Sequence, residues 1–334
     1  MSEPIPHQDA AEPMDGLRRV IAAIASAQIE LEPEDLHAVS RLAPDASGPV
    51  REKIAELESV SRFALLEQLE RISAEFGGYD FTVVFSAMIA DDDLAVRSLA
   101  VSGLATCETA GATTTLLAVA NSEEEDSDVR REAVTALGEV AMRLELGWAS
   151  GENAEQVVDA LRVIAEDVRE DDELRASALV AVGVVTADWM PDLIEEAFQS
   201  DAAALHLGAI QAMGRSADLN WLPVLEGSLV AEDDDERLAA VQAIGEIGSE
   251  EGAPMLLELF DDQSATEELL QGAVAALGEI GGEEAVEELQ QLRTHPDPTV
   301  RATAQAALDE ATWLDDLDDL GAAQQPFGGQ NDFL

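Results

Sequence analysis

A ten-residue pattern of apolar positions recurs along the chain. Its clearest copy is Val129 to Gly138, whose first, fifth, sixth and ninth residues are apolar. This spacing places the apolar side chains on one face of a helix with 3.6 residues per turn. Related segments begin at Val96, Leu174, Leu205, Glu236, Leu269 and Val300. The pattern therefore predicts a series of amphipathic helices.

A second apolar segment precedes each copy, so the repeating unit is a pair of helices. The preceding segments are Phe81–Ile89, Thr114–Ala120, Val157–Val168, Met190–Phe198, Trp221–Leu229, Pro254–Phe260 and Ala285–Leu292. One pair alone cannot bury its apolar face, whereas pairs stacked on their neighbours form a continuous core. We therefore expect an all-α fold in which helical hairpins stack into a solenoid.

The spacing of the copies is regular with one exception. Their second positions are residues 97, 130, 175, 206, 237, 270 and 301, which gives intervals of 33, 45, 31, 31, 33 and 31 residues. The long interval contains Leu146–Asn153, a segment rich in Gly and Ser. Such a composition favours a loop, so we expect an extended connection there.

An acidic residue stands four positions before an arginine in five copies. The pairs are Asp93 and Arg97, Asp126 and Arg130, Asp171 and Arg175, Asp233 and Arg237, and Asp297 and Arg301. An aspartate at a helix start caps free amide groups, and its side chain can reach a residue one turn later. We expect a structural ladder of these pairs. It is interrupted at His206 and Leu270, where the junctions should pack differently.

The order Asp, Val-Arg, then Ala-Val-x-Ala-Leu-Gly-Glu-Ile-Gly resembles the short HEAT repeats named after phycobilisome lyases. Its best matches are Ile244–Gly248 and Leu277–Gly281, and it covers about residues 79–311. The resemblance implies a right-handed α-solenoid, or superhelix, of about seven HEAT-type hairpins. It also implies a protein-binding scaffold, because such repeats serve mainly that purpose.

The flanking regions have their own patterns. Residues 15–78 predict helices at Leu17–Ile29, Glu34–Leu42 and Val50–Phe76, which we interpret as an N-terminal cap or a divergent repeat with Arg51 in the arginine position. Residues 1–14 and the acidic residues 312–334 should be mostly disordered. In this tail Trp313 and Leu314 would cap the solenoid, and the remainder is a hypothetical docking peptide.

The formal net charge is −52, from 18 basic and 70 acidic residues. Nucleic acid is therefore an unsuitable partner, since binding requires basic groups that neutralise phosphates, and an anionic membrane surface is excluded for the same reason. Such self-repulsion is screened at high salt, which favours a salt-loaded cytosol. A GC-rich genome that replaces Lys by Arg is the alternative.

Cysteine content and hydropathy bear on the compartment. Cys107 is the single cysteine, so an intramolecular disulfide is impossible and a thiolate metal site cannot form. The N-terminus lacks the features of a signal or transit peptide, and no apolar run is long enough to span a bilayer. These features predict a cytoplasmic protein without membrane insertion.

Candidate catalytic chemistry is scarce. The four histidines, His7, His37, His206 and His295, are scattered, and no His-Glu dipeptide of the kind carried by HEAT-like deoxyhypusine hydroxylases occurs. Cys107 and His206 fall at packing positions of their helices, which favours structural roles. The acidic clusters lack the spacing of a calcium loop. We therefore expect no catalytic residue, no metal and no cofactor.

Two rows of residues on the second helix of each repeat point away from the core, and in this family that face lines the concave side. They contain no acidic residue at fourteen positions, where composition alone would give about three. A partner peptide or helix would fit such a neutral groove, although crowding between repeats would also exclude charge. The candidate partner-binding residues are Ser98, Ser102, Arg131, Thr135, Leu207, Gln211, Leu238, Gln242 and Gln271.

These observations predict a non-enzymatic scaffold or adaptor that binds a protein of unknown identity on its concave face. Two alternatives remain open. The repeat resemblance suggests a chromophore lyase or chaperone subunit of the phycobilisome-lyase type. A structural subunit buried within a larger assembly is the other.

Overall fold

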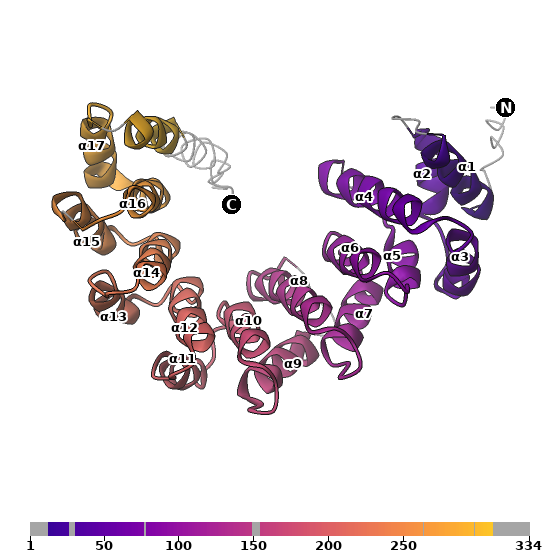
Figure 1. Ribbon diagram of the computed structural model, residues 1–334, viewed down its shortest axis with the longest axis horizontal. Helices are drawn as coiled ribbons and strands as arrows, with labels where there is room; N and C mark the ends of the chain where they lie inside the picture. The colour runs from indigo at the N-terminus through magenta and orange to yellow at the C-terminus, as the bar shows by residue number, and fades with distance from the viewer. Residues whose placement is uncertain are drawn as a thin grey trace, which may run out of the picture. The chain divides into compact units, whose positions relative to one another are not determined.

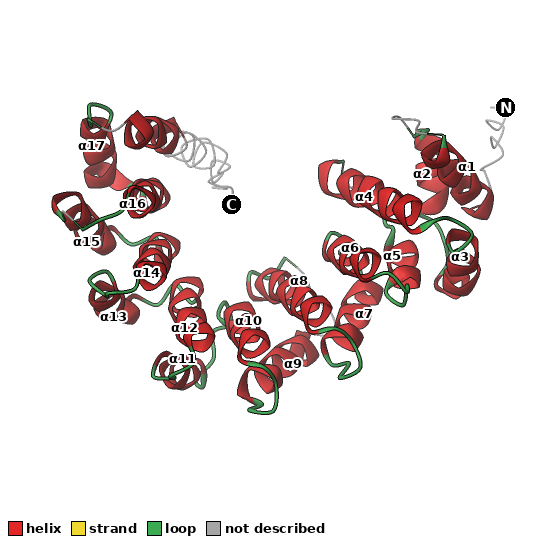
Figure 2. Ribbon diagram, in the orientation of Figure 1, coloured by secondary structure: helices red, strands yellow, loops and turns green. Residues whose placement is uncertain are grey.

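A computed structural model describes residues 13–26, 31–76, 78–148, 154–262, 264–296 and 298–309. All regular secondary structure in these ranges is helical (Figure 2). The chain divides into two compact units, residues 1–187 and 188–334. Each unit stacks antiparallel helical hairpins, so the predicted all-α solenoid is confirmed.

The N-terminal unit consists of consecutive helical hairpins. Its helices are α1 (Pro13–Ala25), α2 (Pro33–Val39), the 3₁₀ turn η1 (Pro44–Ala46), α3 (Ser47–Ile54), α4 (Ser59–Glu75), α5 (Thr82–Met88), α6 (Leu94–Ala105), α7 (Ala110–Ala120), α8 (Ser127–Glu145), α9 (Ala154–Glu166) and α10 (Asp172–Val182).

The C-terminal unit repeats the same arrangement. Its helices are α11 (Met190–Phe198), α12 (Ala203–Arg215), η2 (Leu219–Trp221), α13 (Leu222–Ser228), α14 (Asp234–Ile247), η3 (Glu250–Gly252), α15 (Ala253–Leu257), η4 (Glu258–Asp261), α16 (Glu267–Ile280) and α17 (Gly282–Leu292). A final helix covers residues 298–309.

Within each unit the second helices of successive hairpins pack side by side and form one layer (Figure 1). In the N-terminal unit α4 packs on α6, α6 on α8 and α8 on α10, and in the C-terminal unit α12 packs on α14 and α14 on α16. The apolar positions of the repeat supply this core. Val129, Ala133, Val134 and Leu137 of α8, for example, are fully buried.

Glycine at the tenth repeat position allows neighbouring second helices to approach closely. A Cβ atom at Gly214 would lie 2.7 Å from the Cα atom of Ala243, and one at Gly245 would lie 3.0 Å from the Cα atom of Ala276. Gly138 faces Ala181 in the N-terminal unit in the same way. The glycine that ends the repeat motif is therefore a packing residue.

The aspartates of the predicted ladder cap their helices. The side chains of Asp93, Asp126, Asp171 and Asp233 each accept a hydrogen bond from a backbone amide in the first turn of α6, α8, α10 and α14. Asp297 lies outside the described residues. The capping half of the prediction therefore agrees with the structure at these four positions.

The arginines have different partners from those we expected. Arg130 donates from Nε to the carbonyl of Ala120, 3.1 Å away, at the end of the first helix of its own repeat. Its two Nη atoms bind both carboxylate oxygens of Glu170, at 2.8 and 2.7 Å, in the loop before the next second helix. The arginine thus joins two repeats, because its guanidinium reaches the loop of the neighbouring hairpin rather than the capping aspartate.

Other arginines follow this arrangement to different extents. Arg237 binds the carbonyl of Leu229 and the carboxylate of Asp262, and Arg97 binds the carboxylate of Glu125. Arg175 binds the carbonyl of Ala165 and Asp172 of its own helix, whereas Arg301 binds the carbonyls of His295 and Pro296.

His206 occupies the arginine position of α12 and makes equivalent contacts. Its Nδ1 lies 2.6 Å from the carbonyl oxygen of Phe198, and its Nε2 lies 3.3 Å from a carboxylate oxygen of Glu236. The ring also stacks on Phe198 with centroids 4.5 Å apart. The junction is thus built by an aromatic ring, which agrees with the packing role predicted for His206.

The predicted long helix Val50–Phe76 is wrong, because the segment forms the two helices α3 and α4. The break lies between Ile54 and Ser59, where Arg62 of α4 donates to the carbonyl of Leu57 at 2.9 Å. Arg62 also binds Asp91 and Asp92 at 2.8 Å, before α6. Arg62 is therefore the ladder arginine of this repeat, and the assignment of Arg51 to that position is corrected.

Several predicted boundaries change slightly. The first helix begins at Pro13, within the segment expected to be disordered. Helix α8 is 19 residues long and ends at Glu145, directly before the predicted loop that starts at Leu146. Residues 1–12, 149–153 and 310–334, which include the predicted docking tail, lie outside the described residues.

Candidate functional site

The predicted partner-binding residues lie on the layer of second helices, on the surface of each unit. Thr135 of α8, Gln211 of α12 and Gln242 of α14 are exposed. The remaining predicted residues are half-buried at the same helical phase, namely Ser98, Ser102, Arg131, Leu207, Leu238 and Gln271. All nine are exposed or half-buried, so none of them is fully covered by a neighbouring repeat.

In the N-terminal unit most of these side chains are bound to neighbouring groups. Ser102 donates to the carboxylate of Glu70, and Thr135 donates to the carbonyl of Arg131. Arg131 donates to Glu173 at 2.8 Å and to Asp128 at 2.5 Å. Any partner that used these groups would first have to replace their existing bonds.

In the C-terminal unit the central amides are free. Gln211 and Gln242 occupy equivalent positions on adjacent second helices, and neither side chain forms a hydrogen bond with a described residue. Leu207 and Leu238 lie one helical turn before them. An amide offers both donors and an acceptor, so this surface combines apolar contact with unused hydrogen-bonding capacity.

Acidic residues flank the neutral positions on α14 and α16. Residues four apart are neighbours on a helix surface, and such a series on α14 is Asp234, Leu238, Gln242 and Glu246. The equivalent series on α16 is Glu267, Gln271, Ala275 and Glu279. The acidic positions that end each series are separated by a rise of about 18 Å along the helix axis.

The charge of Glu279 on α16 affects the pKa of Glu246 on α14. The Glu246 side chain is exposed along its length, but its carboxylate lies against the backbone of Gly214. Partial burial raises the pKa of Glu246; Arg215 opposes this shift, and the nearby charge of Glu279 adds to it. A cationic group placed beside Glu246 would favour its ionised form.

The rows extend to α4, which we did not recognise as a second helix from its sequence. With Arg62 in the arginine position, the equivalent residues of α4 are Phe63 and Glu67. The absence of acidic residues therefore holds from α6 onward and not at the N-terminal end of the layer.

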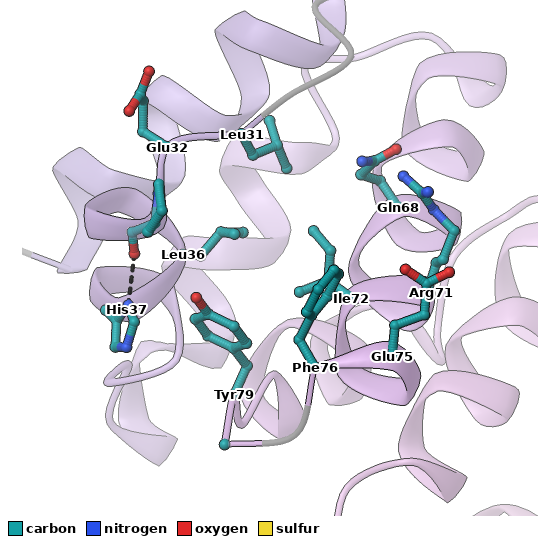
Figure 3. A pocket seen from close by; sticks show the side chains of 12 residues that line it. Leu31, Glu32, Leu36, His37, Gln68, Arg71, Ile72, Glu75, Phe76 and Tyr79 are labelled. Atoms are coloured by element: carbon teal, nitrogen blue, oxygen red, sulfur yellow. Dashed lines mark hydrogen bonds between the residues drawn. The ribbon is translucent and has the colours of Figure 1, made fainter.

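A separate cavity of about 730 Å³ lies between α2 and α4 (Figure 3). Its apolar lining includes Leu31, Leu36, Ile72 and Phe76, and its polar lining includes Glu32, His37, Gln68, Arg71, Glu75 and Tyr79. This cavity could not be identified from the sequence, because its walls come from two hairpins whose separation depends on tertiary packing.

The residues considered for chemistry have structural surroundings. Cys107 is buried, its Sγ lies 3.4 Å from the carbonyl oxygen of Gly103, and burial raises the pKa of the thiol. A thiol in this state is a poor nucleophile. Within the described ranges no group of three or more His, Cys, Asp or Glu side chains could hold a metal ion.

No helix in the described part of the chain is both long and apolar enough to cross a bilayer.

Comparison with known families identifies the repeat. The model of the family described as HEAT repeats matches residues 190–268 and again residues 231–309. The chain contains HEAT repeats over residues 190–309. Both matches fall in the C-terminal unit, and the N-terminal unit consists of hairpins with the same capping aspartates, interhelical arginines and close glycine contacts. No curated protein sequence matches the chain.

Several solved structures are similar to this chain, and one of them, a Kap121p mutant, is similar enough to support the fold assignment. A Kap121p mutant is 14% identical with a TM-score of 0.50, over 96% of this chain and 39% of that protein. The complex of CpcE and CpcF of phycocyanin lyase from Nostoc is 17% identical with a TM-score of 0.41, over 93% and 99% of the two chains. Human deoxyhypusine hydroxylase is 18% identical with a TM-score of 0.34, over 82% and 98%. At these identities the likeness concerns the fold alone.

Proposed function

We propose that this HEAT-repeat protein is a non-enzymatic scaffold or adaptor that binds a partner protein on the second-helix layer of its C-terminal unit, the layer we expect to be concave. The observation that carries the proposal is the neutral strip on α12, α14 and α16, where Gln211 and Gln242 are exposed and form no hydrogen bond with any described residue. The family as a whole supports this reading, because helical solenoids offer long surfaces for protein recognition.

The strip is long enough for one helix to lie across it. An α-helix with its side chains is about 10–12 Å wide, which is less than the rise of about 18 Å between the acidic positions at the two ends of the strip. Leu207 and Leu238 would contact apolar residues of the partner, and the two glutamines would bind its polar atoms. Lysine or arginine side chains at the partner's edges would reach Asp234 and Glu267 on one side, and Glu246 and Glu279 on the other.

The charge of the unit supports a basic partner. Residues 188–334 contain 33 acidic and 4 basic residues, a formal charge of −29, against 37 acidic and 14 basic residues, or −23, in residues 1–187. Attraction between this surface and a basic segment would increase the association rate and fall with added salt. We propose that the protein works in a salt-rich cytoplasm, where the apolar strip would provide most of the affinity.

The test is quantitative affinity capture with the full chain from its own cell extract. The double variant Gln211→Arg and Gln242→Arg adds bulk and positive charge to the strip. We expect recovery of the specific partner to fall at least about tenfold, which corresponds to about 1.4 kcal/mol. The reason is that the new side chains would occupy the groove and repel basic residues.

The matched control is Gln290→Arg on α17, an exposed glutamine of the same unit that forms no hydrogen bond with a described residue. This control should recover the partner as well as the unmodified chain does. Equal recovery with the double variant would refute the proposed surface. Transfer of a substrate group by the purified chain would refute the non-enzymatic assignment.

A further inference from the structure

The cavity between α2 and α4 results from an irregular first hairpin. Helix α2 packs on α1, and α1 packs on α4, so α2 and α4 are held apart by their shared neighbour. Arg19 of α1 and Asp35 of α2 form an ion pair of 2.6 Å that fixes the hairpin. The cavity of about 730 Å³ is within the usual range for small-molecule sites, which is about 300–1,000 Å³.

Apolar side chains line one part of the cavity. Leu31 and Leu36 face Ile72 and Phe76 across it (Figure 3). Phe76 is 63% exposed, so most of its ring is in contact with water. Aromatic residues make up only 4% of the sequence, so an exposed ring is uncommon in this chain. A ligand that covered this ring would remove a large apolar surface from water, and such burial is favourable.

An aromatic wall gives the cavity a fixed edge. The Tyr79 ring stacks on Phe81 with centroids 5.7 Å apart, and Phe81 is fully buried. His37 meets the other side of Tyr79 edge-on at 4.8 Å, and its Nδ1 lies 2.7 Å from the carbonyl oxygen of Pro33. These contacts hold both rings in place without a ligand, so binding would cost little ordering.

Arg71 is the polar feature that distinguishes this cavity. It is the one arginine in the lining, and its guanidinium forms neither an ion pair nor a hydrogen bond with any described residue. The chain has 70 acidic residues, and Glu75 stands one helical turn after Arg71, yet the two side chains are not paired. Gln68 lies one turn before Arg71 on the same wall (Figure 3).

The geometry points to a binding site for a small hydrophobic carboxylic acid. Its apolar body would lie on Leu31, Leu36, Ile72 and Phe76 against the Tyr79 ring, and its carboxylate would accept hydrogen bonds from Arg71 and Gln68. Glu32 and Glu75 also line the cavity and would repel an anion. Arg71 is the one permanently cationic side chain in the described lining, so a ligand with a single acidic group would place that group beside Arg71. This site belongs to the N-terminal unit and does not depend on the partner surface proposed above.

The experiment compares sodium decanoate with decanol, both below micelle-forming concentration, on the full chain. Tyr79 is the only tyrosine, so its ring resonances in tyrosine-labelled protein report on the cavity alone. The titrations are run at 1 M KCl, where the screening length of about 3 Å removes long-range repulsion of the anion. We expect decanoate to bind about tenfold more tightly than decanol, because a hydrogen bond to a charged group contributes more than a neutral one.

Variants assign the preference to Arg71. Arg71→Gln should reduce the decanoate-to-decanol ratio to about one and leave decanol binding unchanged, and Arg71→Met should do the same. Arg143→Gln is the matched control, because Arg143 of α8 also lacks a side-chain partner among the described residues. It should retain the preference. Glu75→Gln should strengthen decanoate binding only, since it removes the nearest competing carboxylate.

Three results would overturn the proposal: no shift of the Tyr79 resonances with either probe, equal affinity for both probes in the unmodified chain, or a preference that survives in both Arg71 variants. Circular dichroism would confirm that each variant is folded, as expected for an exposed and unbonded side chain. Partner capture by the Arg71 variants should be unchanged, so this proposal and the proposed function can fail separately.

Discussion

The two units use the same hairpin but treat the surface of their second helices differently. In the N-terminal unit Ser102, Arg131 and Thr135 are bound to neighbouring groups, whereas in the C-terminal unit the side chains of Gln211 and Gln242 form no hydrogen bond within the described part of the chain. The core positions and the close glycine contacts are alike in both. The repeat therefore fixes the fold, and the residues between the core positions decide which unit presents a binding surface.

Basic residues are the clearest difference. The N-terminal unit holds 14 of the 18 basic residues, and several of them neutralise acidic groups within or between its hairpins. The C-terminal unit holds four, so most of its carboxylates have no internal counter-charge. This asymmetry suggests that the N-terminal unit is stabilised by its own ion pairs, and that the C-terminal unit depends more on salt or on a basic partner.

Removal of a ladder arginine should have the largest effect on stability, and it would test whether internal ion pairs stabilise the N-terminal unit. Arg130 is 7% exposed and its guanidinium binds both Ala120 and Glu170. Arg130→Met should destabilise this unit by about 3 kcal/mol, because it leaves a partly buried carboxylate without its partner. Hydrogen exchange followed by mass spectrometry would measure the effect in each unit separately.

Arg169→Met provides the control for this measurement. Its side chain is 82% exposed and pairs with Asp167 in a loop, so the expected loss of stability is much smaller than for Arg130→Met. A similar loss in both variants would show that the bridge between repeats is not what stabilises the unit.

Substitution of a glycine at a close helix contact in the C-terminal unit should have a smaller effect on stability than loss of Arg130. A Cβ atom at Gly245 would lie 2.7 Å from a carboxylate oxygen of Glu279 and 2.8 Å from the Cβ of Ala276. Gly245→Ala should cost about 1–2 kcal/mol, since the helices must separate. Gly227→Ala in α13 meets no atom within 4 Å and should stabilise the unit by up to about 1 kcal/mol. Urea unfolding would measure the change in free energy for both variants. If both substitutions changed stability in the same direction, the packing role of Gly245 would be contradicted.

Sequence analysis predicted the hairpins from residue 79 onward because their apolar spacing repeats. The region of α3 and α4 was interpreted as a cap or a divergent repeat, but the wrong arginine, Arg51, was assigned to it for a physical reason. Leu65, Leu66 and Leu69 occupy the fifth, sixth and ninth positions, but the first position is Ser61, and the helix break before Ser59 contains neither Gly nor Pro. The signal was present in Arg62 and these three leucines.

The side-chain partners were less predictable than the helices. The spacing of Asp126 and Arg130 suggested a local pair, whereas the guanidinium binds Glu170, which is 40 residues away in sequence. The cavity between α2 and α4 could not be predicted either, because no repeat describes the gap between two differently packed hairpins. The free state of Gln211 and Gln242 likewise depends on which neighbours reach them in space.

Salt should separate the two units further, with an effect that is distributed over many groups. Raising KCl from 0.1 to about 2 M should slow hydrogen exchange in both units, because screening weakens repulsion between carboxylates. The increase in protection should be greater in residues 188–334, where acidic residues outnumber basic ones by 33 to 4. A greater increase in the N-terminal unit would contradict the proposed dependence of the C-terminal unit on counter-ions.

A change of pH should give the smallest effect and act in opposite directions at one carboxylate of each unit. Arg169 lowers the pKa of Asp167 to about 2, so the stability contributed by this aspartate is present above its ordinary value of 3.8 and is lost as the pH falls toward 2. Burial raises the pKa of Glu246 above its ordinary value of 4.5, so its contribution is present below pH 4.5 and is lost as the pH rises through the raised value.

Glu246→Gln should therefore stabilise the C-terminal unit at neutral pH, by no more than about 0.5 kcal/mol, and have no such benefit below pH 4.5. Asp167→Asn should destabilise the N-terminal unit at neutral pH and become neutral near pH 2. Urea unfolding of both variants across this range, in constant salt, would measure the two trends, and a shared direction would contradict the opposite pKa shifts of Asp167 and Glu246.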